Sequence, residues 1–186
     1  DERTAVVMET TQTVVTHGPQ IELHGVDLNN LNKVRNLNAA LFPVRYTAPF
    51  YKSLLQPGQF AQLAICDGVC VGTVTCRAQI LGFADSPTAY SNFQAPPPTE
   101  FEVYMMTLGV LAPYRRLGIA RMLLNSAISA AAADPSVKRI VLHVQIDNDD
   151  ALRFYHKHGF TTSHMVERYY KLLDPPHAYL LQYRLR

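Results

Sequence analysis

The sequence predicts an α/β fold in which a central mixed, mostly antiparallel β-sheet carries helices on both faces. The first half of the chain contains apolar strands joined by a strong hairpin turn. The second half alternates apolar strands with segments whose apolar residues recur at helical spacing. The 186 residues are 48% hydrophobic, which is typical of one globular domain with a real core. Hairpins followed by strand–helix units therefore indicate one mixed sheet between two helical layers.

A short strand and two helices are expected first. The strand covers residues 20–23, and Asp27 can cap the helix that follows. That helix is predicted from apolar residues at helical spacing, namely Leu28, Leu31, Val34, Leu37 and Leu41. Phe42-Pro43 ends it. Thr47, with a proline just inside, starts a second short helix that stops at Pro57-Gly58.

A hairpin and a long loop come next. Strands at residues 61–66 and 69–78 are joined at Asp67-Gly68, a pair that favours a two-residue hairpin turn. Residues 82–99 contain scattered polar residues and four prolines, three of them consecutive at Pro96–Pro98. Regular structure tolerates no such run, so we expect a loop insertion there.

The second half is expected to alternate strands and helices. The predicted segments are residues 101–110 (strand), 118–133 (helix), 139–144 (buried strand), 149–157 (helix), 160–172 (strand) and 177–185 (strand). Asp147 or Asn148 can cap the helix at 149–157, and Gly159 can supply its left-handed end. Pro175-Pro176 separates the last two strands.

Composition argues against several classes of partner. The net charge of +2 is too small to predict binding to nucleic acid or to a membrane surface. Residues 1–19 are polar and acidic without an apolar signal region, so we expect a flexible extension before a domain at residues 20–186. The run of small apolar residues at 127–133 is too short to cross a bilayer.

Three cysteines, Cys66, Cys70 and Cys76, lie close together in the predicted hairpin. Their spacing matches no metal site, and none lies in a motif that suggests an activated nucleophile. We therefore expect no metal, and reduced thiols in a cytoplasmic protein, with the nucleus as an alternative location.

The most informative segment is the strand–turn–helix sequence at residues 106–120. A turn at Ala112-Pro113 leads into Arg115-Arg116-Leu117-Gly118-Ile119-Ala120 and then an apolar helix. The first N–H groups of a helix lack intrahelical partners and lie in the positive potential of its dipole, so this turn suits an anion such as a pyrophosphate. Small residues leave room for it, and arginines add fork-shaped donors. An ordinary turn with a solvated arginine pair is the alternative.

The order Arg-x-x-Gly-x-Ala at residues 115–120 resembles the Arg/Gln-x-x-Gly-x-Gly/Ala signature of the GCN5-related N-acetyltransferases, the GNAT family. Further short blocks resemble, in order, the N-terminal acetyltransferases of the NatE type; they lie at residues 42–46, 104–109, 143–148, 154–155 and 169–171. The resemblance spans residues 21–186 apart from the Pro-rich insertion, and it implies the GNAT fold with acetyl-CoA as cosubstrate. It places these residues against acetyl-CoA: Leu108, Val110, Arg115, Arg116, Leu117, Gly118, Ile119, Ala120, Asn148 and Tyr155.

Two residues are candidates for catalysis, His143 and Tyr104. An imidazole with a pKa of about 6.5 suits removal of a proton from an attacking amine near neutral pH. The resemblance pairs this histidine with a tyrosine through an ordered water, and it places Tyr155 beside the thioester sulfur. We expect the amine to attack the thioester directly, without an acyl-enzyme. The alternatives are a core histidine and strand or helix aromatics that only pack.

The resemblance also implies an apolar slot for the first residues of a peptide. Its walls would be Phe42, Pro43, Val44, Tyr46, Met106, Tyr169, Tyr170 and Leu172. By spacing alone, any one of these would be assigned to the core. Tyr169 and Tyr170 are adjacent on the strand predicted at residues 160–172, where alternation would send their rings to opposite faces.

An N-terminal amine is the better nucleophile for such a site. About a quarter of α-amines with a pKa of about 7.8 are neutral near pH 7.4, against about one in a thousand lysines. We therefore expect N-alpha-acetylation of proteins that begin with Met followed by a non-acidic, apolar residue. The alternatives are lysine acetylation, acetylation of small-molecule amines, and a non-catalytic scaffold. The resemblance implies nascent chains as substrates and association with the NatA complex and the ribosome.

Overall fold

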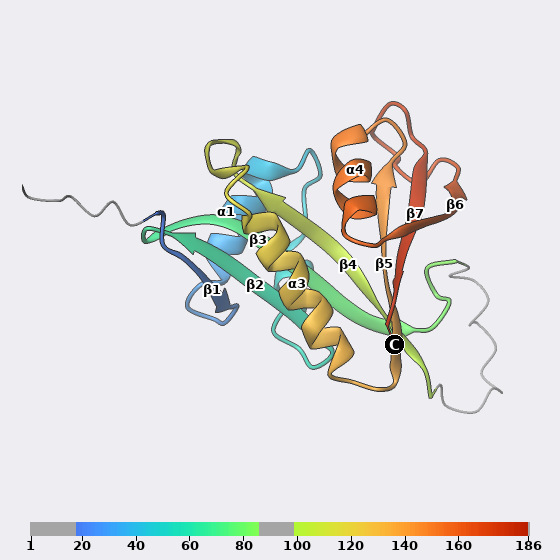
Figure 1. The fold of residues 1–186 in the computed structure, drawn as a ribbon, viewed down its shortest axis with the longest axis horizontal. Helices are drawn as coiled ribbons and strands as arrows, with labels where there is room; N and C mark the ends of the chain where they lie inside the picture. Colours follow the sequence, from blue (N-terminus) through green and yellow to red (C-terminus); the bar gives the residue numbers. More distant parts are fainter. Residues whose placement is uncertain (1–17, 86–98, 186) are drawn as a thin grey trace, which may run out of the picture.

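The computed structural model describes residues 18–85 and 99–185 (Figure 1). One seven-stranded sheet has the order β1-β2-β3-β4-β5-β7-β6. Its strands are β1 (Ile21–Gly25), β2 (Gln59–Cys66), β3 (Val69–Ile80), β4 (Phe101–Val110), β5 (Val137–Gln145), β6 (Thr161–Val166) and β7 (Ala178–Arg184). The helices are α1 (Leu31–Leu41), α2 (Ala48–Ser53), α3 (Ile119–Ala132) and α4 (Asp149–Lys157), and a short 3-10 helix, η2 (Ala112–Tyr114), precedes α3.

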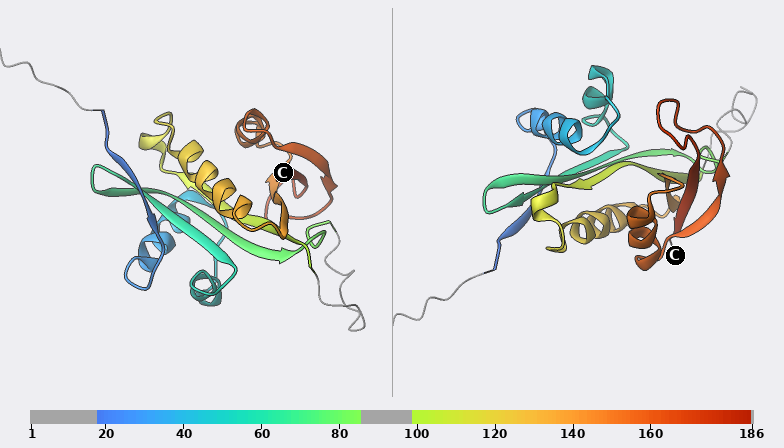
Figure 2. Two further views of the ribbon diagram at one scale, coloured as in Figure 1. Left: turned by 60° about the horizontal axis from the view of Figure 1, so that its bottom comes forward. Right: turned by 90° about the horizontal axis from the view of Figure 1, so that it is seen from above.

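Helices cover both faces of the sheet, as the right-hand view of Figure 2 shows. On one face, Leu123 of α3 packs in a buried cluster with Val74 of β3 and Tyr155 of α4. On the other face, Val34 of α1 packs with Leu63 of β2. The predicted α/β fold, a mixed sheet between two helical layers, is confirmed.

The sheet opens in its middle, between β4 and β5. These neighbours are parallel, and their pairing runs from Phe101 with Val137 to Tyr104 with Val141. Beyond Tyr104, β4 continues to Val110 and β5 to Gln145. In the described part of the chain, no residues of these two segments pair with each other. The two strands diverge visibly in Figure 1. The opening therefore begins at one of the two candidate catalytic residues.

Local turn chemistry confirms several predicted boundaries. Asp67 and Gly68 both have positive φ, 48° and 81°, as a type I′ hairpin turn between β2 and β3 requires. Asn148 is the residue that caps α4, because its side chain accepts a hydrogen bond from the Ala151 N–H at 3.1 Å. Gly159, with φ 89°, supplies the predicted left-handed position after α4.

The first helix begins later than predicted. It starts at Leu31, and Leu28 is 81% exposed instead of lying on the buried helical face. The reason is that the Asp27 carboxylate accepts hydrogen bonds from the N–H groups of Asn29 and Asn30, at 2.8 and 3.0 Å. This local bonding stabilises a turn in place of the first helical residues.

The predicted strand at residues 160–172 is too long. β6 ends at Val166, and the chain then forms an irregular segment up to β7. Arg168 has φ 51°, a left-handed conformation that extended structure cannot include. Tyr169 and Tyr170 consequently lie in the β6–β7 loop, and the expectation that a strand would send their rings to opposite faces is wrong.

Two predicted features fall mostly outside the described residues. These are the N-terminal extension at 1–19, of which 18–19 are described, and the insertion at 82–99, of which 82–85 and 99 are described. Within the described ranges, no helix has the length and apolar character that spanning a membrane requires.

Candidate active site

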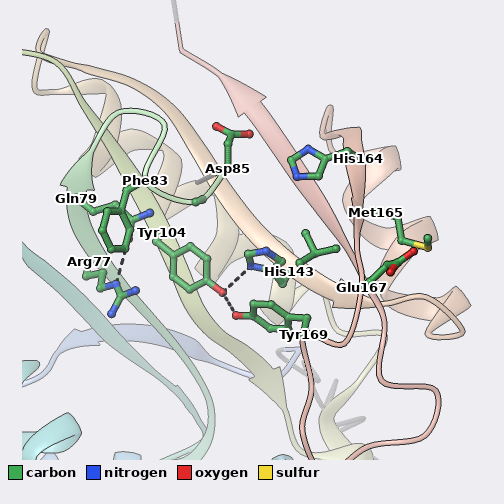
Figure 3. Close-up of a pocket in the computed structure, with 12 residues that line it drawn as sticks. Arg77, Gln79, Phe83, Asp85, Tyr104, His143, His164, Met165, Glu167 and Tyr169 are labelled. Carbon is green, nitrogen blue, oxygen red and sulfur yellow. Dashed lines mark hydrogen bonds between the residues drawn. The ribbon is translucent and has the colours of Figure 1, made fainter. Parts of the chain in front are cut away.

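A hydrogen-bonded cluster of three rings lies where β4 and β5 separate (Figure 3). The Tyr104 hydroxyl on β4 is 2.9 Å from Nδ1 of His143 on β5, and 2.6 Å from the Tyr169 hydroxyl. The Tyr169 ring stacks on the imidazole with 3.9 Å between ring centroids and 14° between planes. Tyr104 and His143 therefore contact each other directly, and no bridging water is needed to connect them.

The β6–β7 loop brings a second tyrosine to the same place. The Tyr170 hydroxyl donates to the backbone carbonyl of His143 at 3.5 Å, and the Tyr169 and Tyr170 rings meet edge to face at 4.8 Å. The Tyr170 N–H donates to the carbonyl of Pro176 at 2.8 Å, which ties the loop to the start of β7. Both tyrosines thus face one site, although they were predicted to face away from each other.

Burial sets the protonation state of the cluster. It lowers the pKa of His143 to about 4, assisted by His164 and opposed by Asp85. It raises the pKa of Tyr104 far above its usual value, and the neighbouring Tyr169 hydroxyl raises it further. Near neutral pH the imidazole is therefore uncharged and able to accept a proton, while the Tyr104 phenol keeps its own.

An aromatic group from the segment between α1 and β2 borders this cluster. Tyr46 stacks on Phe50 at 4.4 Å and meets Phe42 edge to face at 6.4 Å. Burial raises the pKa of Tyr46 to about 12, and the nearby Tyr51 and Tyr169 contribute.

Other residues predicted for the slot differ in exposure. Met106 is partly buried against the cluster that contains Tyr46, and Val44 is 41% exposed. Pro43 is exposed, and Leu172 is 96% exposed, so Leu172 forms no wall in this structure. Met106 is also the extra residue of a β-bulge, because Met105 pairs with Cys76 while Thr107 pairs with Thr75.

The predicted phosphate turn lines a cavity of about 400 Å³. Gly118 precedes α3 in the left-handed conformation, with φ 80°, and a Cβ built there would meet no atom within 4 Å. Arg115 is held by a hydrogen bond from its Nε to the Val110 carbonyl at 3.1 Å. The predicted residues that line the cavity are Val110, Arg115, Arg116, Gly118, Ile119 and Ala120.

Three basic residues that line this cavity were not predicted: Arg121, Lys157 and His158. Arg121 lies in the first turn of α3, where a cation opposes the helix dipole unless an anion is close. That unfavourable placement was visible in the sequence. Lys157 and His158 come from the end of α4, which only the fold brings to the turn.

The remaining residues predicted for acetyl-CoA lie outside the walls of that cavity. Leu108 is partly buried within β4, and Leu117 is 42% exposed. Asn148 caps α4. Tyr155 is buried in the core, and its hydroxyl donates to Sδ of Met105 at 3.8 Å. Burial raises the pKa of Tyr155, with Cys76 and Tyr170 contributing.

The ring cluster opens onto a second cavity, of about 380 Å³, whose walls were not predicted. Besides Tyr104, His143 and Tyr169, it is lined by Arg77, Gln79, Phe83, Ala84, Asp85, His164, Met165, Val166 and Glu167 (Figure 3). The Arg77 guanidinium lies 5.2 Å from the Tyr104 ring centroid. These residues come from two segments far apart in the sequence, and no local motif marks them.

The cysteines carry no feature of a nucleophile. Cys66 and Cys76 are buried, Cys70 is partly buried, and all three are free thiols. Burial raises the pKa of Cys76 to about 12 and also raises that of Cys70. In residues 18–85 and 99–185, no group of three or more His, Cys, Asp or Glu side chains is placed to hold a metal ion.

Comparisons with known proteins agree with this geometry. The model of the Acetyltransferase (GNAT) family matches residues 31–160. N-alpha-acetyltransferase 50 of Danio rerio is 39% identical over 167 residues, which cover 90% of each chain. Probable N-acetyltransferase san of Drosophila melanogaster is 37% identical over 166 residues, which cover 89% of this chain and 82% of that protein.

Solved structures share the fold. Arabidopsis thaliana Naa50, in complex with the bisubstrate analogue CoA-Ac-MVNAL, has a TM-score of 0.74 at 35% identity, covering 88% of this chain and 97% of that one. Arabidopsis thaliana NAA60, in complex with acetyl-CoA, has a TM-score of 0.75 at 22% identity, covering 89% of this chain and 100% of that one.

Proposed function

Because the chain belongs to the acetyltransferase (GNAT) family, we propose that it is an N-alpha-acetyltransferase that acetylates the free N-terminal amine of proteins. The observation that carries the proposal is the position of the hydrogen-bonded Tyr104–His143 pair at the opening of the sheet. The cationic cavity, which is the one lined by Arg115, Arg116 and Arg121, lies toward the α3–α4 face. The aromatic slot, formed by Phe42, Tyr46 and Phe50, lies toward the α1–α2 face. An acetyl donor and an amine can therefore meet at this pair.

Acetyl-CoA is the cosubstrate, and it supplies the thioester-bound acetyl group. The cavity beside Gly118 fits its pyrophosphate, because the N-terminus of α3 and the side chains of Arg115, Arg116 and Arg121 all favour anions there. The opening between β4 and β5 leads from this cavity toward Tyr104.

His143 accepts the proton that the amine loses. Its imidazole is neutral above about pH 5 because its pKa is about 4. When Nδ1–H donates to the Tyr104 oxygen, Nε2 is left to accept a proton directly or through a water. The amine nitrogen becomes more acidic as its new bond forms, which lets a weak base complete the step. Between pH 7 and 9 the rate should therefore follow the amine, with a pKa of about 7.8.

The slot favours an apolar first residue. Phe42, Tyr46 and Phe50 offer ring faces and edges to a flexible side chain such as that of methionine. The hydroxyls of Tyr169 and Tyr170, which bond Tyr104 and the His143 carbonyl in this structure, would bond the peptide backbone when the substrate is present. A weak base serves an α-amine better than a lysine, since far more of the α-amine is already neutral near pH 7.4.

Association with a NatA-type complex on the ribosome, and a cytoplasmic location, remain predictions from the family resemblance. They would bring the slot to nascent N-termini, which are the substrates proposed here. Neither is required for turnover by the isolated chain, so activity can be tested first.

The purified chain should acetylate a peptide that begins with Met-Leu in preference to one that begins with Ser-Glu. We expect at least about a tenfold difference in kcat/KM, because an apolar side chain gains burial in the slot whereas a carboxylate loses solvation there. A matched peptide with a blocked N-terminus and an internal lysine serves as the control. Equal kcat/KM for the first two peptides would contradict the apolar slot, and faster turnover of the blocked peptide would identify a lysine acetyltransferase.

A further inference from the structure

A buried carboxylate lies behind the cavity that adjoins the ring cluster. Glu102 of β4 is 0% exposed. Its oxygens accept hydrogen bonds from Nε2 of Gln79 at 2.8 Å and from the backbone N–H groups of Gly82 and Ala84 at 3.0 and 2.8 Å. Arg139 of β5 donates to it from Nε and Nη2, at 2.8 and 2.7 Å. A carboxylate this far from water needs such a full set of partners.

These contacts fix the chain that leaves β3. Two of the donors to Glu102 are backbone N–H groups of the turn at residues 81–85, so the carboxylate holds main chain in place and not only side chains. Arg139 reaches past Glu102 to the Asp85 carboxylate at the end of the turn. Its Nη1 also donates to Gln182 of β7 at 3.1 Å. One hydrogen-bonded ionic cluster thus joins four strands, β3, β4, β5 and β7, to the turn.

The held turn forms one wall of the cavity, and β6 forms the other (Figure 3). Consecutive residues line each wall, Phe83–Asp85 on one side and His164–Glu167 on the other. Successive side chains of a strand point to opposite faces, so the three consecutive β6 residues at the cavity, His164–Val166, mean that the strand presents its edge there. β6 is an outer strand of the sheet, and that edge can pair with an added extended chain.

The cavity continues from the ring cluster. Tyr169 lines the cavity, and its hydroxyl is 2.6 Å from that of Tyr104, where the amine is proposed to bind. A peptide with its amine at Tyr104 and its first side chain in the slot would therefore direct its following residues along the β6 edge. The cavity volume of about 380 Å³ is at the lower end of the range for ligand sites, which suits a few residues of main chain.

We propose that this cavity is a subsite for the extended main chain of the substrate residues that follow the acetylated one. Glu102 and Arg139 are positioning residues that hold the wall at Phe83–Asp85 opposite β6. This inference rests on the proposed N-terminal acetylation. It adds a site that binds the substrate main chain and makes KM depend on peptide length. The slot still selects the first residue.

Kinetics with two peptide lengths test the subsite. The parent chain should show a KM about threefold to tenfold lower for a ten-residue peptide beginning with Met-Leu than for the Met-Leu amide, since only the long peptide reaches β6. Glu102→Gln replaces one carboxylate oxygen by an N–H₂ group, which cannot accept the hydrogen bonds that Arg139 and the 81–85 turn donate. The turn is then no longer held against the cavity. The substitution should raise KM for the long peptide to the value for the short one. It should leave kcat for the short peptide and the dissociation constant of acetyl-CoA unchanged.

Glu100→Gln is the matched control. Glu100 pairs with Lys138 at 3.6 Å beside the Glu102–Arg139 pair, but both Glu100 and Lys138 are exposed and outside the cavity. The control should keep the length dependence of the parent. Asp85→Asn, which changes a half-exposed group and spares the core, should reduce the length dependence in the same direction as Glu102→Gln.

A substrate-side measurement does not depend on folding of a variant. N-methylation of residues three and four of the long peptide removes main-chain donors, and it should raise KM of the parent toward that of the short peptide. Equal KM values for long, short and methylated peptides would overturn the subsite. An equal loss for both lengths in Glu102→Gln would reduce Glu102 to a purely structural role and overturn its positioning role. No turnover of any peptide would contradict the proposed function itself.

Discussion

The chemical properties of His143 depend on the residues that surround it. A lone histidine in an apolar strand is usually a hydrogen-bonded core residue, and His143 has the hydrogen-bond partner of one, although it is only partly buried. It also faces a cavity and stacks on a loop tyrosine. The sequence supported Tyr104 and His143 as a pair only through family resemblance. Nothing local in the sequence places Tyr169, because the β6–β7 loop brings it to the imidazole.

Replacing His143 by alanine should lower kcat by about a hundredfold, the lower end of the range for general bases, because an imidazole with a pKa of about 4 is a weak base. Tyr104→Phe should also lower kcat. The double variant should lose less than the sum of the two losses in free energy, since the hydroxyl and Nδ1 are 2.9 Å apart and act as one unit.

Steady-state kinetics, with calorimetric titration of acetyl-CoA, measure these effects. The dissociation constant of acetyl-CoA should stay near that of the parent in both single variants, because the cationic cavity does not include either residue. Near-parent kcat in His143→Ala would show that His143 only packs, and the base would then have to be sought elsewhere.

The elements that sequence predicts best are those with strong local chemistry. Asp67-Gly68 fixes a hairpin through two positive φ angles, and Gly118 occupies a left-handed position before α3 as the turn requires. Where the predicted element boundaries were wrong, another local conformation was more stable than the predicted one. Asp27 bonds the backbone of a turn in place of a helix, and Arg168 ends β6 early. The opening between β4 and β5 is set by the register of distant segments, which single-segment patterns do not contain.

The phosphate turn gives a prediction with its own control. Gly118→Ala and Gly118→Glu impose the same left-handed strain, of about 1–2 kcal/mol, and a Cβ meets no neighbour there. Gly118→Glu alone adds a carboxylate, which should repel the pyrophosphate and weaken acetyl-CoA binding at least about tenfold more than Gly118→Ala does. Isothermal titration calorimetry can compare the two. Equal affinities of the two variants would place the pyrophosphate elsewhere.

At the scale of the whole molecule, the stability of the fold and the proposed catalysis both depend on the partly buried imidazole of His143. The pKa of His143 falls from about 6.5 in the unfolded chain to about 4 in the fold, because burial disfavours the charged ring. On acidification the unfolded state therefore takes up this proton first. The stability linked to His143 is complete above about pH 6.5 and is lost as the pH falls toward 4.

Urea unfolding at pH 7 and pH 5 measures this loss. The His143 contribution should be about 2 kcal/mol between these two pH values. His143→Asn removes the titrating group, so its free energy of unfolding should fall less over the same interval. Parallel losses in the parent and the variant would mean that His143 titrates alike in both states and is not buried as the structure shows.

The gap between β4 and β5 also bears on the order of events in a catalytic cycle. Helices α3 and α4 lie on one face of the sheet, and α1 and α2 on the other (Figure 2). Under the proposed function the acetyl donor would arrive from the first face and the polypeptide from the second, so spent CoA would be exchanged for a fresh donor while a long polypeptide stays docked. Since both reactants would be present together, the acetyl group would pass directly to the amine without an acyl-enzyme intermediate. The cysteine thiols need not react. A sheet that was continuous here would force the two molecules to share one entrance.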